Sequence, residues 1–215
     1  GVILDLVGLA ANLYRRGVPY IKIPTTLLGI IDVSVAAKTG INFEDRRNRL
    51  GSYYPPIITF LDKSFLKTVP FLEISSGLGE ILKMGVIKTK YLFEMLETSG
   101  KILLNTKFDC DKADEIIGLS IQGMKEELEN NLWEKDLKRI VDFGHTFSPI
   151  IEMRSLNSNK PLTHGQAVTL DIIFCCVISH LRNMLSLNDV TRVINTAKIL
   201  GLPVFHESFV KPQLL

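Results

Sequence analysis

Three side chains in this sequence of 215 residues could together bind one divalent metal ion. Glu80 lies in the segment GLGEILK, His145 in DFGHT and His164 in THGQ. One carboxylate and two imidazoles leave coordination positions open for water or substrate, which is typical of catalytic metal sites. The chain has only four histidines, and these two each stand beside a glycine, where backbone or ligand can approach closely. The pattern therefore predicts an open metal site.

A simpler interpretation of each residue stays open at this point. Glu80 and Lys83 are three positions apart on an expected helix, so they could form an ordinary surface ion pair. The apolar residues around them instead predict a largely buried helix, in which charges need a partner or a metal. A lone histidine in a turn is usually a polar surface residue. We interpret His180 and His206, which have no comparable context, as structural.

A second group of polar residues could bind a nucleotide or a phosphate. Thr25 and Thr26 follow an expected strand, and hydroxyls at that edge of an α/β sheet are placed to contact a nucleotide. Asp32 and Lys38 flank the apolar stretch that comes next. Three arginines between positions 46 and 49 could hold a phosphate, although a solvated loop is the simpler interpretation of that segment.

The composition limits the class of protein. A content of 46% hydrophobic residues is enough for one large domain or two small ones. The formal net charge is +2 and the basic residues are scattered, so we expect no nucleic-acid partner. The longest apolar stretch, 167–181, contains Asp171 and is short for a bilayer span, so we expect no membrane partner. The three cysteines are interpreted as reduced core thiols of a cytoplasmic protein.

The pattern of apolar residues predicts an α/β part over 1–70 and a helical part over 71–215. In the first part we expect a helix over 2–14, a strand over 20–23, a helix over 27–37, a polar loop over 38–56 and a buried parallel strand over 57–61. In the second part we expect helices over 73–95, 112–129, 145–154, 165–182 and 189–200, and no strand. Thr163 and Gln166 fit a capping box, which would place His164 in the first turn of a helix.

Taken together, these motifs resemble the sugar phosphate cyclases, the superfamily of 3-dehydroquinate synthase. The similar segments run almost from end to end: GVILD at 1–5, YRRG at 14–17, PTTLL at 24–28, Asp32, KTG at 38–40, Asn48, FLKT at 65–68, Gly79, Glu80, Lys83, FGHT at 143–146, and His164 with Gly165. The resemblance implies part of a Rossmann-like NAD-binding domain followed by an all-helical metal-binding domain. The chain opens on Gly1 without a methionine, which we interpret as a fragment that begins inside the glycine-rich NAD turn.

The resemblance also implies roles for individual residues. Glu80, His145 and His164 correspond to the ligands of a divalent metal, zinc or cobalt. The implied NAD contacts are Gly1, Asp5, Thr25, Thr26, Thr68 and Arg47, which replaces the usual lysine. The implied substrate contacts are Arg16, Asp32, Asn48 and Lys138, and the implied catalytic residues are Lys38, Lys83 and Asp142.

Departures from the dehydroquinate synthase pattern indicate a different substrate. Asp142 replaces an asparagine, Pro149 replaces a histidine, and Met124 and Lys138 stand where that family has lysine and arginine. Fewer cations argue against a carboxylate substrate, because an unpaired carboxylate in a dry site is costly. These segments resemble instead the cyclases of sedoheptulose 7-phosphate. Leu128 with Asp142 is the pattern of the 2-epi-5-epi-valiolone synthases.

The implied reaction is a phosphate-eliminating cyclisation, the work of a carbon–oxygen lyase. It comprises transient oxidation by NAD, elimination of phosphate, reduction, and an intramolecular aldol step, and the family is commonly homodimeric. Alternatives within the fold are 3-dehydroquinate synthase, desmethyl-4-deoxygadusol synthase and a metal-dependent polyol dehydrogenase. A non-catalytic remnant that binds only a metal or a partner also stays open. We expect these 215 residues alone to bind NAD poorly and to turn over little.

Overall fold

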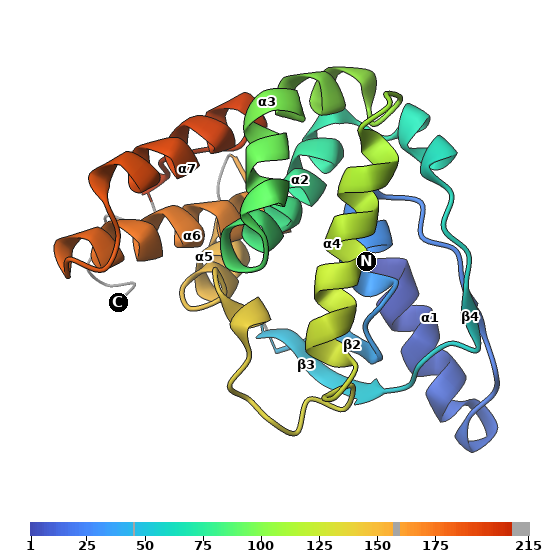
Figure 1. Ribbon diagram of the computed structural model, residues 1–215. Helices are drawn as coiled ribbons and strands as arrows, with labels where there is room; N and C mark the ends of the chain where they lie inside the picture. The colour runs from blue at the N-terminus through green and yellow to red at the C-terminus, as the bar shows by residue number, and fades with distance from the viewer. Residues whose placement is uncertain (45, 157–159, 208–215) are drawn as a thin grey trace.

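The computed structural model describes residues 1–44, 46–156 and 160–207, with the backbone alone at positions 46 and 47. Its first part contains short strands and one long helix, and its second part is helical (Figure 1). The elements of the first part are α1 (Val2–Leu13), η1 (Tyr14–Arg16), β1 (Ile21–Lys22), η2 (Gly29–Val33), β2 (Lys38–Phe43), β3 (Arg46–Tyr53), β4 (Ile58–Thr59) and η3 (Lys63–Thr68). Those of the second part are α2 (Phe71–Ile87), α3 (Lys90–Thr106), α4 (Ala113–Leu128), η4 (Ile140–Asp142), α5 (Ser148–Ser155), α6 (His164–Leu181) and α7 (Leu187–Ile199).

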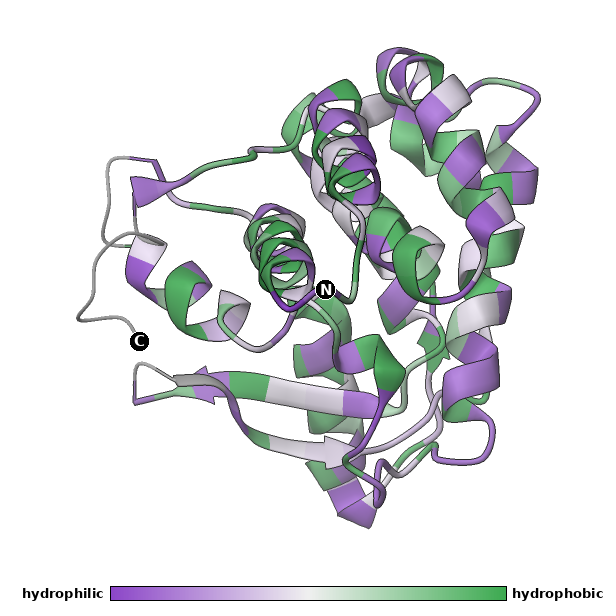
Figure 2. Cartoon of the chain, turned by 60° about the vertical axis from the view of Figure 1, so that its left-hand side comes forward, coloured by the Kyte–Doolittle hydropathy of each residue, from purple (hydrophilic) through white to green (hydrophobic). Residues whose placement is uncertain are grey.

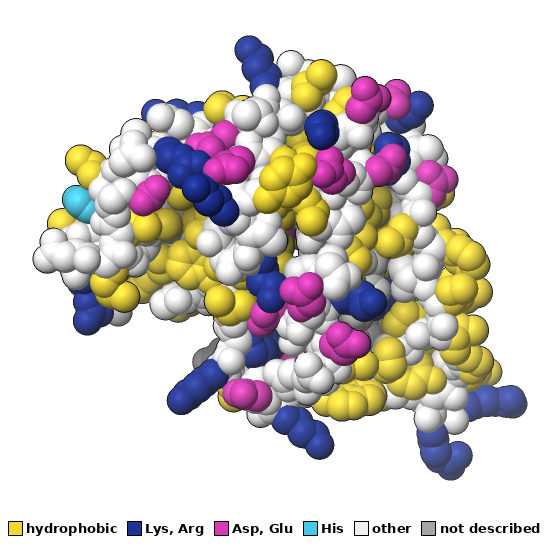
Figure 3. Space-filling model, in the orientation of Figure 1, with side chains coloured by type: hydrophobic (Ala, Val, Ile, Leu, Met, Phe, Trp, Pro, Cys, Tyr) yellow, Lys and Arg dark blue, Asp and Glu magenta, His cyan; other side chains and the backbone are white. Residues whose placement is uncertain are grey.

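The two expected strands of the α/β layer pair in parallel, with Ile21 opposite Ile58. The prediction that 57–61 is a buried strand is wrong, because only Ile58 and Thr59 pair and their neighbours are exposed, Ile57 by 70% and Phe60 by 52%. This sheet has two strands in the described part of the chain, too few to enclose an apolar run. Hydrophobic side chains accordingly gather on the surface over α1 and β4 (Figure 3).

The predicted polar loop over 38–56 is also wrong, because β2 and β3 form an antiparallel hairpin there. Gly40 pairs with Gly51, and the strands approach so closely that a Cβ atom on Gly51 would lie 2.3 Å from the Thr39 carbonyl oxygen. The helix α1 packs against β2. Both strands carry residues of mixed hydropathy (Figure 2). Strand pairing uses only backbone groups, and much of the hairpin is exposed to solvent, so polar side chains are compatible with these strands.

The second part of the chain is helical, as predicted, but some of its helices begin or end at other residues than expected. The expected helix over 73–95 is two helices, α2 and α3, separated at Lys88 and Thr89. Thr89 caps α3 by accepting a hydrogen bond from the Leu92 amide, so the chain turns where the apolar pattern looks continuous. No strand lies beyond residue 70 in the described ranges, as expected.

The helix α6 crosses the middle of the helical part, where it packs against α2, α5 and α7. It begins at His164 behind the expected capping box of Thr163 and Gln166. Its 18 residues are long and apolar enough to cross a membrane by composition alone, but half of the stretch is buried inside the protein. The buried Asp171 also has polar partners within the fold, which is the pattern of a core helix.

Candidate metal centre

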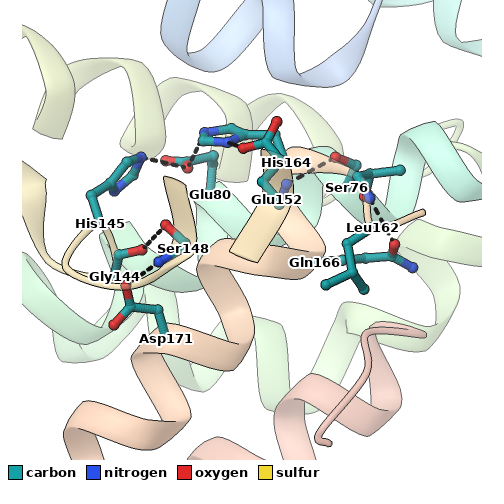
Figure 4. A network of polar contacts seen from close by, with 12 residues as sticks. Ser76, Glu80, Gly144, His145, Ser148, Glu152, Leu162, His164, Gln166 and Asp171 are labelled. Carbon is teal, nitrogen blue, oxygen red and sulfur yellow. Dashed lines mark hydrogen bonds and ion pairs between the residues drawn. The ribbon is translucent and has the colours of Figure 1, made fainter. Parts of the chain in front are cut away.

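Glu80, His145 and His164, which are far apart in the sequence, converge at one point of the helical part (Figure 4). Their potential ligand atoms all lie within 4.8 Å of one another. Glu80 Oε1 is 3.3 Å from His164 Nε2 and 3.9 Å from His145 Nε2, so the carboxylate lies between the two rings. One divalent ion could contact all three atoms at normal coordination distances after small side-chain movements.

The carboxylate of Glu80 is buried on the interior face of α2. Neither of its oxygens has a hydrogen bond of good geometry from any described residue, although Lys83 Nζ lies 2.5 Å away as an ion-pair partner. Buried carboxylate oxygens are normally satisfied. With two imidazole nitrogens beside it, this carboxylate forms a donor set that fits a divalent cation.

The electrostatics of the cluster favour the metal-binding forms of Glu80 and His145. Burial by itself would raise the pKa of Glu80, but the Lys83 ammonium and both imidazoles outweigh it and hold this pKa well below its usual range. Burial lowers the pKa of His145, and the nearby Glu80 carboxylate only partly opposes that effect. An ionised carboxylate and a neutral imidazole are the ligand forms that bind zinc.

His145 lies in a turn just before α5, and not within the helix that we expected from 145 onward. Gly144 has a φ of +79°, and a Cβ atom there would lie 2.8 Å from Ile172 Cγ1, so the turn needs glycine. Asp171 on α6 accepts hydrogen bonds from the amides of Phe147 and Ser148 at 2.6 and 2.8 Å. The carboxylate of Asp171 thereby caps α5 and holds the turn that carries His145.

A chain of ion pairs lies beside the metal cluster and connects the hairpin to the helical part. Lys38 Nζ is 2.6 Å from the buried Glu134 carboxylate, which also pairs with Arg139. Arg139 binds both carboxylate oxygens of Asp142, at 2.7 and 3.0 Å. The guanidinium therefore fixes the orientation of Asp142 at the edge of the site.

Several predicted substrate residues have clear positions. Lys83 interacts electrostatically with Asp32 and Asp142 as well as with Glu80, so these predicted residues share one charged region. Lys138 is exposed, while its neighbour Arg139 makes the contacts described above. Arg16, in η1, and Asn48, in β3, are exposed and both have positive φ, at 65° and 48°. Their roles stay predictions.

The predicted NAD residues lie in the first part of the chain. Gly1 precedes α1 and Asp5 lies in its first turn. Thr26 Oγ1 accepts a hydrogen bond from the Gly29 amide, and a Cβ atom on Gly29 would be 3.1 Å from that oxygen and 3.8 Å from Leu4 Cδ1. The start of α1 therefore lies beside the turn after β1. Thr25 and Thr68 are exposed, and the side chain of Arg47 is outside the described part of the structure.

Sequence reasoning missed four residues that support the site: Glu134, Arg139, Glu152 and Asp171. Each has an acidic or basic side chain that contacts a predicted site residue or the turn that carries one. For Asp171 a signal was present, because a carboxylate inside an apolar helix needs polar partners. Glu152 and Glu134 contact residues of other elements, so spacing in the sequence gives no indication of them. Arg139 pairs with Asp142 only three positions away, but its side chain has no distinguishing mark in the sequence.

Comparisons with protein families agree with this geometry. Residues 1–76 match the 3-dehydroquinate synthase N-terminal family, and residues 77–215 match the 3-dehydroquinate synthase C-terminal family. The 2-epi-5-epi-valiolone synthase of Streptomyces hygroscopicus subsp. jinggangensis (strain 5008) is 44% identical over 212 residues, which are 96% of this chain and 50% of that protein. Its solved structure, ValA with NAD+ and Zn2+ bound, has a TM-score of 0.93 over 98% of this chain and 57% of that one, at 44% identity.

Two further relatives have other products or substrates in their names. The demethyl-4-deoxygadusol synthase of Trichormus variabilis is 38% identical over 214 residues, 96% of this chain and 52% of that protein. A solved 2-deoxy-scyllo-inosose synthase, complexed with carbaglucose-6-phosphate, NAD+ and Co2+, is 25% identical, with a TM-score of 0.77 over 92% of this chain and 53% of that one. The chain spans about half the length of the curated relatives it matches.

Proposed function

Because the chain belongs to the 3-dehydroquinate synthase family and has its fold, we propose that it supplies the metal site and part of the substrate site of a sugar phosphate cyclase. The proposed reaction converts sedoheptulose 7-phosphate into 2-epi-5-epi-valiolone and releases phosphate. The observation that carries the proposal is the convergence of Glu80, His145 and His164, whose potential ligand atoms lie within 4.8 Å of one another. The 44% identity to a 2-epi-5-epi-valiolone synthase supports this choice of product.

We propose that Glu80, His145 and His164 hold a zinc or cobalt ion, since the corresponding solved relatives contain Zn2+ and Co2+. Such an ion supplies a Lewis acid that polarises a substrate oxygen. Lys83 brings a positive charge next to Glu80, which keeps this ligand ionised. The same ammonium faces Asp142 and Asp32, so it can also donate a hydrogen bond to a substrate hydroxyl in this region.

We assign the rim of the site to Lys38 and Asp142. The side chain of Lys38 is 50% exposed, so its ammonium can leave Glu134 and reach a substrate phosphate or hydroxyl. Asp142 keeps free lone pairs beyond the two that Arg139 occupies, and these can accept hydrogen bonds from sugar hydroxyls. Pro149 has no proton to transfer, so proton movements in this region fall to the charged side chains.

We propose that the first 70 residues form part of a Rossmann-like NAD-binding domain and that residues 71–215 form the metal- and substrate-binding domain. The start of α1 beside the turn after β1 supports this assignment, since dinucleotides bind where a helix begins at the carboxyl edge of a sheet. NAD supplies reversible hydride transfer when it is bound. The cytoplasmic location and the homodimer expected from the sequence stay predictions.

A chimera of ValA tests the proposed reaction. This chain would replace the half of ValA that it matches, and the chimera would receive sedoheptulose 7-phosphate, NAD+ and Zn2+. We expect 2-epi-5-epi-valiolone and stoichiometric phosphate, without net accumulation of NADH, by mass spectrometry and NMR. A deoxygadusol product, or growing NADH absorbance, would identify the alternative enzymes of the fold. A folded chimera that binds zinc but forms no product contradicts the proposal.

A further inference from the structure

His164 and His145 present the same ring nitrogen to the metal position but have different partners behind them. Both Nε2 atoms face Glu80 Oε1. The Nδ1 atom of His145 lies 3.4 Å from the Phe143 carbonyl oxygen, which is a long contact with a neutral acceptor. The Nδ1 atom of His164 lies 2.9 Å from Glu152 Oε2, which is a short contact with a carboxylate.

Only one tautomer of His164 is compatible with both neighbours when a metal is present. A metal on Nε2 needs the lone pair of that nitrogen, so the proton must be on Nδ1. Glu152 Oε2 is then the acceptor of this Nδ1–H bond. A carboxylate behind a ligating imidazole fixes its orientation and increases its basicity.

Three contacts fix α5, the helix that carries Glu152. Ile151, the preceding residue, is buried in an apolar cluster with Leu162, Ala167 and Leu170, and this cluster packs α5 on α6. Asp171 caps the beginning of α5, and Ser155 Oγ accepts a hydrogen bond at 2.9 Å from the Leu162 amide at its end. The position of Glu152 therefore follows from the docking of the whole helix. Figure 4 shows its side chain against His164, on the side away from His145.

From this geometry we propose that Glu152 is a positioning residue of the metal centre, which orients His164 and strengthens its bond to the metal. The inference rests on the proposed metal site. Glu152 places a second carboxylate, besides that of Glu80, in direct contact with the His164 ring. A negative charge behind the ring favours its bond to a cation.

The positioning role of Glu152 can be tested by measuring the zinc affinity of the chain, without an enzyme assay. Competition with a chromogenic chelator would compare the wild-type chain with Glu152→Ala and Glu152→Gln. We expect about a 10- to 100-fold loss of affinity in the alanine variant, the range for removing such outer carboxylates. The glutamine variant should lose less, because its amide oxygen still accepts the Nδ1–H bond but carries no charge. Glu94→Gln, an exposed residue on α3, is the matched control and should bind zinc like the wild type.

Proton NMR of the zinc-loaded chain observes the hydrogen bond itself. We expect a downfield, exchange-protected imidazole N–H signal in the wild type that disappears in Glu152→Ala. Urea unfolding of the metal-free variants separates this role from a merely structural one, which would lower the unfolding midpoint and leave zinc affinity unchanged.

The outcomes distinguish the two proposals. If a folded Glu152→Ala variant binds zinc as tightly as the wild type, the positioning role is overturned and the metal site stands. If the alanine variant does not fold, Glu152→Gln takes its place in this comparison. A wild-type chain that binds no zinc overturns the metal site itself, and the role of Glu152 with it.

Discussion

Gly165 at the start of α6 lies directly against the backbone of Ser76 on α2, so that a Cβ atom at position 165 would be 1.8 Å from the Ser76 carbonyl oxygen. The Gly165 amide also donates a hydrogen bond to Ser76 Oγ at 3.1 Å. This contact brings the helix that carries Glu80 next to the residue before Gly165, which is His164. The proposed metal site therefore depends on a helix crossing that only glycine permits.

We expect Gly165→Ala to separate the two helices. The free energy of unfolding should fall by about 3 kcal/mol, the upper range for overpacking, and zinc affinity should fall more than tenfold. Urea unfolding and chelator competition measure the two effects. Gly118→Ala is the control, because position 118 on α4 has open space for a Cβ atom and should gain about 0.5–1 kcal/mol in stability. Equal effects of both substitutions would contradict this account.

Removing only one charge of the Glu80–Lys83 ion pair should lower the free energy of unfolding more than removing both charges. In the metal-free chain, Glu80→Gln leaves a buried ammonium without its main partner, so we expect a loss of about 3–5 kcal/mol in unfolding free energy. Glu80→Gln combined with Lys83→Met removes both charges and should recover most of that loss. Chemical denaturation of the two variants tests the coupling. A double variant no more stable than the single one would show that the pair does not behave as a unit.

Asp171→Asn should loosen the turn that carries His145. The variant keeps the shape of the side chain but weakens two hydrogen bonds from buried amides, so we expect a loss of about 1–2 kcal/mol and weaker zinc binding. Urea unfolding and chelator competition again measure these changes. Asp111→Asn, at an exposed position, is the control and should change neither quantity. Unchanged zinc affinity in Asp171→Asn would mean that the turn is held by other contacts.

Arg139→Lys should affect substrate binding in the ValA chimera. One ammonium cannot bind both oxygens of Asp142 and Glu134 together, so we expect about a tenfold rise in KM, or about 1.4 kcal/mol, with a smaller change in kcat. Steady-state kinetics with sedoheptulose 7-phosphate measure both constants. Lys138→Met is the informative companion, because the sequence resemblance assigns the substrate contact to that exposed residue. If Lys138→Met raises KM more than Arg139→Lys does, Lys138 is the residue that contacts the substrate, and this account of Arg139 is wrong.

The adjacent thiols on α6 should react slowly with alkylating reagents. Burial raises the pKa of Cys175 to about 12, with a further contribution from Asp171, and burial raises the pKa of Cys176 to about 11. Since the thiolate is the reactive form, only about one molecule in 1,000 to 10,000 is reactive at pH 8. Mass spectrometry after iodoacetamide treatment should find both thiols unmodified in the folded chain and modified in urea. Rapid labelling of the folded chain would contradict the raised pKa values of the two thiols.

The sequence by itself determined the features that depend on residues close to one another in the chain. Apolar spacing predicted the helices of the second part, and Thr163 and Gln166 predicted the beginning of α6. Residue chemistry was sufficient to select Glu80, His145 and His164 as candidate ligands. The motifs around them carried the family resemblance, because each motif is a short local segment.

Tertiary structure decided the features that depend on contacts between distant segments. The β2–β3 hairpin looked like a polar loop, because strand pairing satisfies backbone groups and leaves no mark on side-chain polarity. The break between α2 and α3 was hidden by a continuous apolar pattern. The contact of Glu152 with His164 depends on the docking of α5 on α6, and the contact of Glu134 with Lys38 depends on the position of the hairpin beside the helical part. The reason is physical: an ionic or hydrogen-bonded contact needs two groups within about 3 Å, and only the folded chain sets that distance.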